Sequence, residues 1–202
     1  MQEIVRQFIS ELRQTSFLEF IAVFTGIASV WFSKKENILV YPVGLVNTTI
    51  YVYLSIKGDL FGEASVNLYY TVMSIYGWII WTRKNDKQQY VLTVTKSSSK
   101  EWRMHLLFFA VFYITIYAAL IYLRQEFNAK TIPWADALAS ATAYTGMWLM
   151  AKKKVESWFW WIATNTVSIR LYYIKGFAFT SVPYVLLLVL AIFGWLEWYR
   201  RA

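Results

Sequence analysis

The stretch NTTIYVYLSIKG at residues 47–58 returns as NTVSIRLYYIKG at residues 165–176, with Asn, Thr, Ile, Lys and Gly at matching positions 118 residues apart. Three other landmarks recur in the same order at offsets of 117 to 120 residues: Thr25-Gly26 as Thr145-Gly146, Glu36 as Glu156, and GWIIW at 77–81 as GWLEW at 194–198. Four landmarks in one order are difficult to obtain by chance. The pattern therefore predicts two copies of one structural unit within a single chain.

The composition indicates the environment in which these copies fold. Hydrophobic residues make up 58% of the 202 residues, and charged residues only 16%, whereas a soluble domain is about 45–50% apolar and about 25% charged. We therefore expect an all-α membrane protein. The chain has no Cys and one His, which excludes disulfides, thiolate nucleophiles and metal sites built from several Cys or His ligands.

Seven apolar segments are long enough to cross the bilayer as helices, which need roughly 20 residues each. They cover residues 17–33, 38–57, 63–81, 104–123, 134–151, 156–175 and 180–199. Residues 1–16 lack the apolar core of a signal peptide and predict a short amphipathic helix at the membrane surface. The longest polar stretch, residues 82–103, is predicted to be a flexible loop on the cytoplasmic side.

The basic charge of the chain is distributed unevenly over the predicted loops. The loops after the first, third and fifth spans, together with the C-terminus, hold 13 Lys and Arg residues, and the opposite side holds six. The positive-inside rule places the richer side in the cytoplasm, with the N-terminus outside and the C-terminus inside. The net charge of +8 is thus an orientation signal, and we expect no nucleic-acid partner.

The repeats predict a 3+1+3 arrangement, with residues 17–81 as the first three-helix repeat, 104–123 as a linker helix and 134–199 as the second repeat. The first and fifth spans are four crossings apart, so the repeats run parallel around a pseudo-two-fold axis along the membrane normal. Asn47 and Asn165 then lie at matching depth near the midplane. Such residues either bind substrate at the repeat interface or tie two helices together.

Aromatic and acidic residues supply the other candidates. The rings of Trp78, Trp195, Trp161, Tyr69 and Tyr70 lie away from the span ends, where they either line a site or pack helices. Symmetry favours bringing Trp78 and Trp195 toward the axis, while Trp81 and Trp198 at the span ends favour interfacial anchoring. Glu19 and Asp136 fall near the outer ends of equivalent spans. They either attract cations to the outer mouth or are ordinary first-turn acids.

The strings IYGWxxW at 75–81, PWADA at 133–137 and KVESWFWW at 154–161 leading to Asn165, together with Glu19, resemble the PnuC family of bacterial vitamin transporters. The 3+1+3 arrangement is also similar to that of the SWEET sugar transporters. The PnuC resemblance covers nearly the whole chain. It implies a multi-pass protein of the bacterial inner membrane that mediates facilitated diffusion of a vitamin precursor, nicotinamide riboside in most members and thiamine in a related branch. It also implies that an intracellular kinase traps the substrate.

One position departs from that family pattern. Ser74 precedes IYGW where the family often has Asn, which leaves thiamine open. Both candidate substrates are flat aromatic cations, which aromatic cages hold by cation–π attraction. A SWEET-like sugar carrier and a ligand-gated sensor acting through residues 82–103 are the alternatives. Nucleotide-binding and HExxH motifs are absent, so we expect no enzyme and no cofactor; homo-oligomerisation and ion coupling stay open.

Overall fold

The computed structural model describes residues 16–57, 61–127, 132–174 and 178–202. The amphipathic helix predicted for residues 1–16 therefore lies, apart from Ser16, outside the described residues. Seven helices occupy the described part of the chain. They are α2 (Phe17–Lys34), α3 (Val40–Lys57), α4 (Phe61–Trp81), α5 (Ser99–Phe127), α6 (Pro133–Ala151), α7 (Ser157–Ile174) and α8 (Ala178–Arg201). The all-α fold class and the order of the spans are confirmed.

Local sequence signals explain where the helices begin. The Ser16 hydroxyl accepts from the Glu19 backbone N–H while the Glu19 carboxylate accepts from the Ser16 N–H, which is a capping box at the start of α2. Ser98 and Glu101 make the same reciprocal bonds at the start of α5. This second box starts the linker helix at Ser99, so the predicted start at residue 104 and the predicted loop end at 103 were wrong.

Three of the described helical segments are long and apolar enough to cross a membrane by length and hydropathy alone: Phe17–Lys34, Ser99–Gln125 and Ser181–Arg201. The other helices, α3, α4, α6 and α7, each carry several Gly, Ser, Thr or Asn residues. One of these, α6, is buried along much of its length. The more polar helices therefore place small and polar groups where other helices cover them, as expected for interior elements of a membrane bundle.

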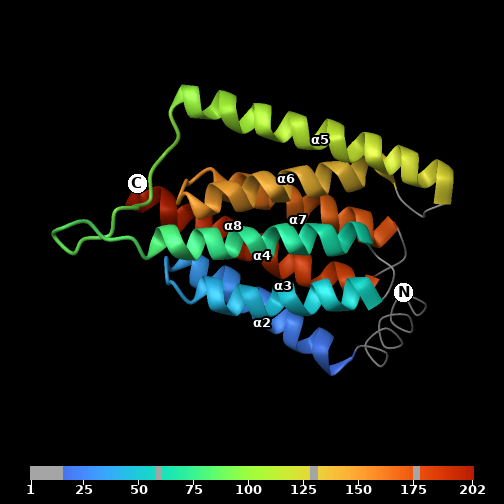
Figure 1. Ribbon diagram of the computed structural model, residues 1–202, viewed down its shortest axis with the longest axis horizontal. Coiled ribbons are helices and arrows are strands. Elements are labelled where there is room, and N and C mark those ends of the chain that lie inside the picture. Colours follow the sequence, from blue (N-terminus) through green and yellow to red (C-terminus); the bar gives the residue numbers. More distant parts are fainter. Residues whose placement is uncertain (1–15, 58–60, 128–131, 175–177) are drawn as a thin grey trace.

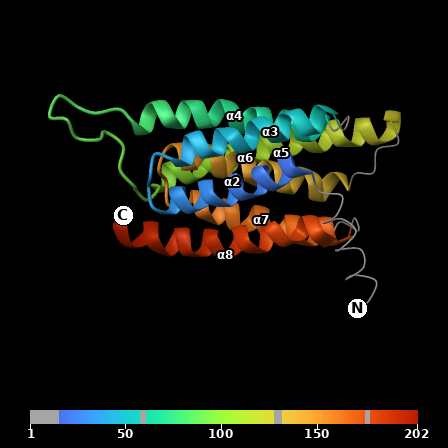
Figure 2. The same ribbon diagram turned by 90° about the horizontal axis from the view of Figure 1, so that it is seen from below.

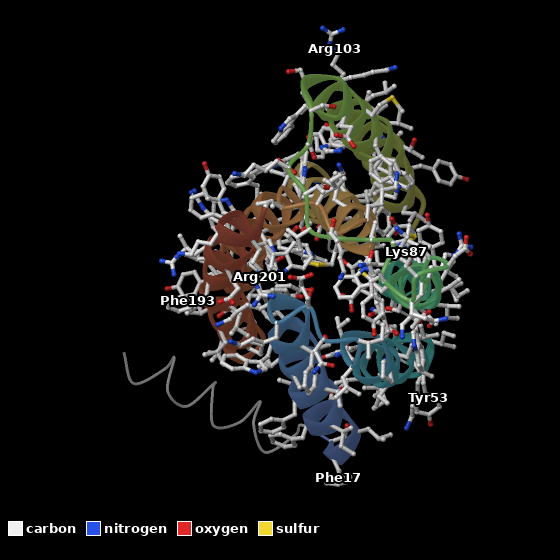
Figure 3. All side chains as sticks on the ribbon, turned by 90° about the vertical axis from the view of Figure 1, so that its left-hand side faces the viewer. Phe17, Tyr53, Lys87, Arg103, Phe193 and Arg201 are labelled. Atoms are coloured by element: carbon white, nitrogen blue, oxygen red, sulfur yellow. The ribbon has the colours of Figure 1, made fainter. Side chains whose placement is uncertain are left out.

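Six helices form a closed ring, and α5 lies outside it against α6 (Figures 1 and 3). Around the ring, each helix contacts the next in the order α2, α3, α4, α6, α7, α8, and α8 returns to α2. The junctions α2–α8 and α4–α6 join the repeats, and each pairs a first helix with a third helix. The axes of the helices are roughly aligned with one another, as Figure 2 shows from a second side. This arrangement matches the predicted 3+1+3 parallel repeats.

Two hydrogen bonds fix the register of the repeats. The Trp81 indole N–H donates to the Ala151 carbonyl at 2.9 Å, and the Trp198 N–H donates to the Lys34 carbonyl at 3.2 Å. The two donors, Trp81 and Trp198, are 117 residues apart, and so are the two acceptors, Lys34 and Ala151. The bounds of α3 and α7 differ by the same 117 residues. The two bonds are therefore equivalent: rotation about the pseudo-two-fold axis places one on the other.

This register corrects part of the predicted alignment. Only the GWxxW landmark has the structural offset of 117 residues. Glu36 corresponds to Lys153, since both have φ of 52° in the turn that follows the first helix of their repeat. Thr25 corresponds to Thr142, since both hydroxyls bond backward to two carbonyls of their own helix. The offsets of 118 and 120 reflect similar residues one to three positions away from the true equivalents.

The end of the bundle that carries the C-terminus and residues 82–98 is called here the strap end, and the opposite end is the far end. At the strap end, the Trp81 and Trp198 rings face each other across the axis with centroids 6.2 Å apart. Trp81 is 3% exposed and Trp198 0%. Each ring also meets an aromatic edge of its own repeat, Tyr41 at 5.1 Å and Trp158 at 5.4 Å. The indole pair thus closes the axis at this end.

Charged groups cover the indole pair. The Lys153 ammonium lies 4.5 Å from the Trp81 ring centroid and 3.2 Å from the Glu36 carboxylate. The other Glu36 oxygen accepts from Arg201 at 2.8 Å. Glu36 therefore links the turn after α6 to the end of α8. Figure 3 looks onto the strap end, where Arg201 is labelled.

The buried indole bonds generate a stability prediction. Trp81→Phe and Trp198→Phe each remove one N–H donor while keeping a ring, so each should cost about 1 kcal/mol and lower the midpoint of thermal unfolding, followed by circular dichroism in detergent. Trp78→Phe is the matched control, because Trp78 is 39% exposed. An equal loss in all three variants would show that the reciprocal bonds do not stabilise the joint.

Candidate functional site

Aromatic side chains from both repeats gather inside the bundle. Tyr69 and Tyr70 come from α4, Tyr144 from α6 and Trp161 from α7. The Tyr69 ring lies 4.4 Å from that of Tyr144, and its hydroxyl donates to the Tyr144 carbonyl at 3.1 Å. The Tyr70 ring faces the Trp161 ring at 6.1 Å. These four residues are called the aromatic cluster.

Three members of the aromatic cluster, Tyr69, Tyr70 and Trp161, were sequence candidates, and the structure brings them together. Tyr144 was missed, as was Phe112 of α5, whose ring lies 5.1 Å from that of Tyr144. Tyr144 had no reliable signal, because the Thr145-Gly146 landmark that it precedes is not at the structural offset of the repeats. Phe112 had none, since an aromatic residue in a linker helix is normally assigned to lipid contact.

The two repeats differ in residue size where they approach the axis. A Cβ atom on Gly44 would lie 3.7 Å from the Ser29 Cβ and 3.9 Å from the Ser74 hydroxyl oxygen. In the second repeat a Cβ on Gly146 would lie 3.3 Å from the Trp161 ring. The 117-residue register pairs these positions: Ser29 with Gly146, Gly44 with Trp161, and Ser74 with Ala191. The first repeat thus offers small polar groups where the second offers an indole ring.

Asn47 and Asn165 have different surroundings. The Asn47 side-chain amide donates to the Ala22 carbonyl of α2 at 2.6 Å. A Cβ on Gly26 would lie 2.8 Å from that amide nitrogen, so the absence of a side chain at Gly26 permits the contact. Asn47 therefore ties α3 to α2, as the alternative interpretation required.

Asn165 is 4% exposed on α7, and within the described part of the chain no hydrogen bond from its side-chain amide is seen. The register places it one residue beyond the equivalent of Asn47, which is Thr164. That threonine instead shares a hydrogen bond with Thr142 of α6 at 2.9 Å. The predicted equivalence of the two Asn residues was wrong, and a substrate-binding role for Asn165 stays a prediction.

Trp78 and Trp195 do not lie on the axis, which corrects the predicted cage. Trp78 faces outward, and Trp195 packs on Phe159 and Tyr199, two exposed rings. The reason is helical geometry: Gly77 and Trp81 are four residues apart and share the inward face, while Trp78 is rotated by about 100°. A Cβ on Gly77 would collide with the Tyr41 ring. The glycine of GWxxW therefore lies on the inner face of α4, and the second Trp of the motif lies on the same face.

Glu19 and Asp136 are equivalent in the 117-residue register and lie at the far end. Glu19 belongs to the capping box of α2. One Asp136 oxygen accepts from the Ile132 N–H at 2.7 Å in the first turn of α6. Both carboxylates thus cap helix N-termini, where negative charge is favourable. Their contribution to attracting cations remains a prediction.

A separate cavity of about 460 Å³ lies away from the aromatic cluster, between the far ends of α5 and α6. Its lining consists of Tyr117, Ile121, Arg124, Gln125, Pro133 and Trp134. Tyr117 and Trp134 are exposed, and exposed Tyr, Trp and Arg side chains at helix ends are typical of a membrane interface. The cavity is outside the ring of six helices, so we place the candidate site at the aromatic cluster.

The contrast between the two Asn residues can be tested by stability alone. Asn47→Leu removes the tie to Ala22 and should lower the thermal midpoint, for a loss of about 1 kcal/mol. Asn165→Leu removes no hydrogen bond seen within the described residues and should leave the midpoint within about 1 °C of the wild type. Circular dichroism melts of both purified variants decide this, and a larger loss for Asn165→Leu would contradict the assignment.

Comparison with known proteins identifies relatives of this chain. Residues 16–200 match the family model described as nicotinamide mononucleotide transporter. The nicotinamide riboside transporter PnuC of Escherichia coli is 22% identical over 207 residues, covering 93% of this chain and 87% of the relative. PnuC of Neisseria mucosa is 27% identical over 192 residues, covering 91% of this chain and 72% of the relative.

A riboflavin/roseoflavin transporter, RibM of Streptomyces davaonensis, is 22% identical over 177 residues, covering 88% of this chain and 82% of that protein. The fold also matches the crystal structure of the vitamin B3 transporter PnuC with a TM-score of 0.72 at 21% identity, covering 98% of this chain and 89% of the other. The family match spans almost the entire described chain. This chain therefore belongs to the nicotinamide mononucleotide transporter family.

Proposed function

We propose that this protein is a membrane transporter that carries nicotinamide riboside across the bacterial inner membrane by facilitated diffusion. The observation that carries the proposal is the aromatic cluster, in which the rings of Tyr70 of the first repeat and Trp161 of the second lie 6.1 Å apart. Family membership and the named substrate of two PnuC relatives support the same class of substrate.

The chemistry of the cluster suits a flat aromatic cation. The pyridinium ring of nicotinamide riboside carries a fixed positive charge, and the faces of Trp and Tyr rings attract cations by about 0.5–2 kcal/mol per ring. Such attraction needs no buried acid. In agreement with that, acidic side chains in the described helices lie near helix ends, so the middle of the bundle is not strongly negative.

The polar side of the site orients the substrate. Ser29 and Ser74 lie close to Gly44 of the first repeat, and Asn165 is a buried amide on α7 of the second. A carboxamide or ribose hydroxyls can pair with these groups, because an Asn side chain offers two donors and an acceptor and a Ser hydroxyl offers both functions. The asymmetry of the two repeats favours one orientation of an asymmetric substrate. Thiamine, a larger aromatic cation, is the alternative that direct competition distinguishes.

Transport itself should be passive. Coupling to protons usually uses ionisable side chains deep in the membrane, and the acids of the described helices occupy positions near helix ends instead. Phosphorylation of the nucleoside inside the cell would add negative charge that the aromatic cluster does not favour. A trapping kinase would therefore make uptake unidirectional without any coupling in the transporter.

An uptake experiment tests the function. Proteoliposomes should bring labelled nicotinamide riboside to equal internal and external concentrations, with no accumulation under an imposed proton or sodium gradient. Trp161→Ala should weaken binding roughly 5–30-fold, because it removes one cation–π ring, and Trp78→Ala should bind like the wild type because Trp78 faces outward. Accumulation driven by a gradient, or equal effects of the two substitutions, would contradict the proposal.

The same experiment separates substrates. Unlabelled thiamine should compete weakly and a neutral sugar should not compete at all, since a sugar offers no charge for the rings. Tighter binding of thiamine than of nicotinamide riboside would reassign the substrate while keeping the site. Competition by a sugar alone would favour a carrier of the SWEET kind.

The orientation follows from charge. The strap end holds the basic loops, so we place it in the cytoplasm. Lys87 lies on the exposed loop at this end, as Figure 3 shows. The chain has no native Cys, so a Lys87→Cys variant should resist a membrane-impermeant thiol reagent in intact cells and react after lysis. Labelling in intact cells would invert the topology.

A further inference from the structure

The loop after α4 contains a bound segment, residues 92–97, which we call the strap. Its side chains alternate as in an extended strand: Leu92 and Val94 point into the bundle and Thr93 and Thr95 outward. The predicted flexible loop over 82–103 was therefore wrong for this part. The sequence signal was the short apolar–polar alternation from Leu92 to Thr95.

The strap is held by the second repeat. The Thr95 N–H donates to the Lys153 carbonyl and the Thr95 carbonyl accepts from the Val155 N–H, both at 3.1 Å. Both oxygens of the Glu156 carboxylate accept from Ser97, from its N–H at 2.9 Å and from its hydroxyl at 2.6 Å. These partners all lie in the turn between α6 and α7. The strap would therefore move with the second repeat.

The buried side chain of the strap belongs to the apolar cluster at the joint between the repeats. Val94 is 8% exposed and belongs to one packed cluster with Trp81 of the first repeat and Trp198 of the second. It is attached by backbone bonds to the second repeat, yet the apolar cluster that it joins includes Trp81 and Tyr41 of the first. A separation of the repeats at this end would uncover Val94.

The segment between α4 and the strap can absorb such a movement. Residues 84–90 form a small hairpin in which Lys84 pairs with Tyr90 and the Asn85 side chain accepts from the N–H groups of Lys87 and Gln89. Val91 is 62% exposed, and the hairpin projects away from the helices in Figure 1. The connection therefore has chain length to release when α4 moves.

We propose that Val94 is a plug that the second repeat carries, and that the strap end opens when Val94 separates from the first repeat's part of this cluster, Tyr41 and Trp81, while the bonds of Thr95 and Ser97 persist. Alternating access in transporters with internal repeats moves one repeat against the other around a central site. The inference extends the proposed transport function by naming the closure at one end. Its test needs no substrate.

The test uses a single cysteine as a reporter of opening. Ser74 is buried on the inner face of α4, between the aromatic cluster and Trp81, and the chain has no other thiol. The Ser74→Cys variant in lipid nanodiscs is treated with a polar maleimide, and the labelling rate reports how often the interior opens to water. Val94→Ser weakens the plug, and Val91→Ser makes the same change three residues earlier on an exposed side chain.

We expect Val94→Ser to raise the labelling rate roughly ten-fold, because removing two buried methyl groups shifts the closed–open equilibrium by that order, and Val91→Ser to leave it unchanged. Equal rates in the two variants would overturn the proposal. Val94→Ala serves as a milder variant, and circular dichroism melts verify that the helices stay folded. If the Ser74→Cys variants label as described but the wild type transports no nicotinamide riboside, the proposed substrate fails while the plug stands.

Discussion

Two indole N–H groups that each reach a carbonyl of the opposite repeat determine how this molecule is assembled. Trp81 donates to the end of α6 and Trp198 to the end of α2. Helix C-termini leave carbonyls without partners, and in a membrane protein few other donors are available. Because each repeat supplies one donor and one acceptor, the joint is satisfied only when both repeats have the same fold and face each other around one axis.

A symmetric joint leaves the middle of the bundle free to be asymmetric. The register pairs Gly44 with Trp161 and Ser74 with Ala191, so one repeat provides small polar groups and the other a large ring. A substrate with an aromatic cation at one end and hydroxyl or amide groups at the other needs this difference. Duplication would thus supply the scaffold, and later divergence of a few inward positions would supply the site.

The sequence predicted the helices well because hydrophobic length is a property of each segment by itself. It predicted the register less well. Asn47 and Asn165 have similar sequence surroundings, yet the Asn47 amide donates a hydrogen bond to the Ala22 carbonyl. Only the packing of α3 against α2 reveals this bond. Which of Trp78 and Trp81 points inward depends on the rotation of α4 about its axis. The close contact of Gly77 with Tyr41 fixes that rotation. The strap was missed because its partners, residues 153–156, are distant in sequence.

The closure at the strap end combines contacts of different strength, and this determines which of them can open. The indole bonds and the Glu36 ion pairs join the repeats directly, so separating the repeats must break them together. Water entering the opened end can replace each of these polar partners, which keeps their net cost near 1 kcal/mol apiece. Water cannot replace apolar contacts in this way. The apolar cluster that contains Trp81, Val94 and Trp198 is therefore the part of the closure whose lost contacts water cannot replace.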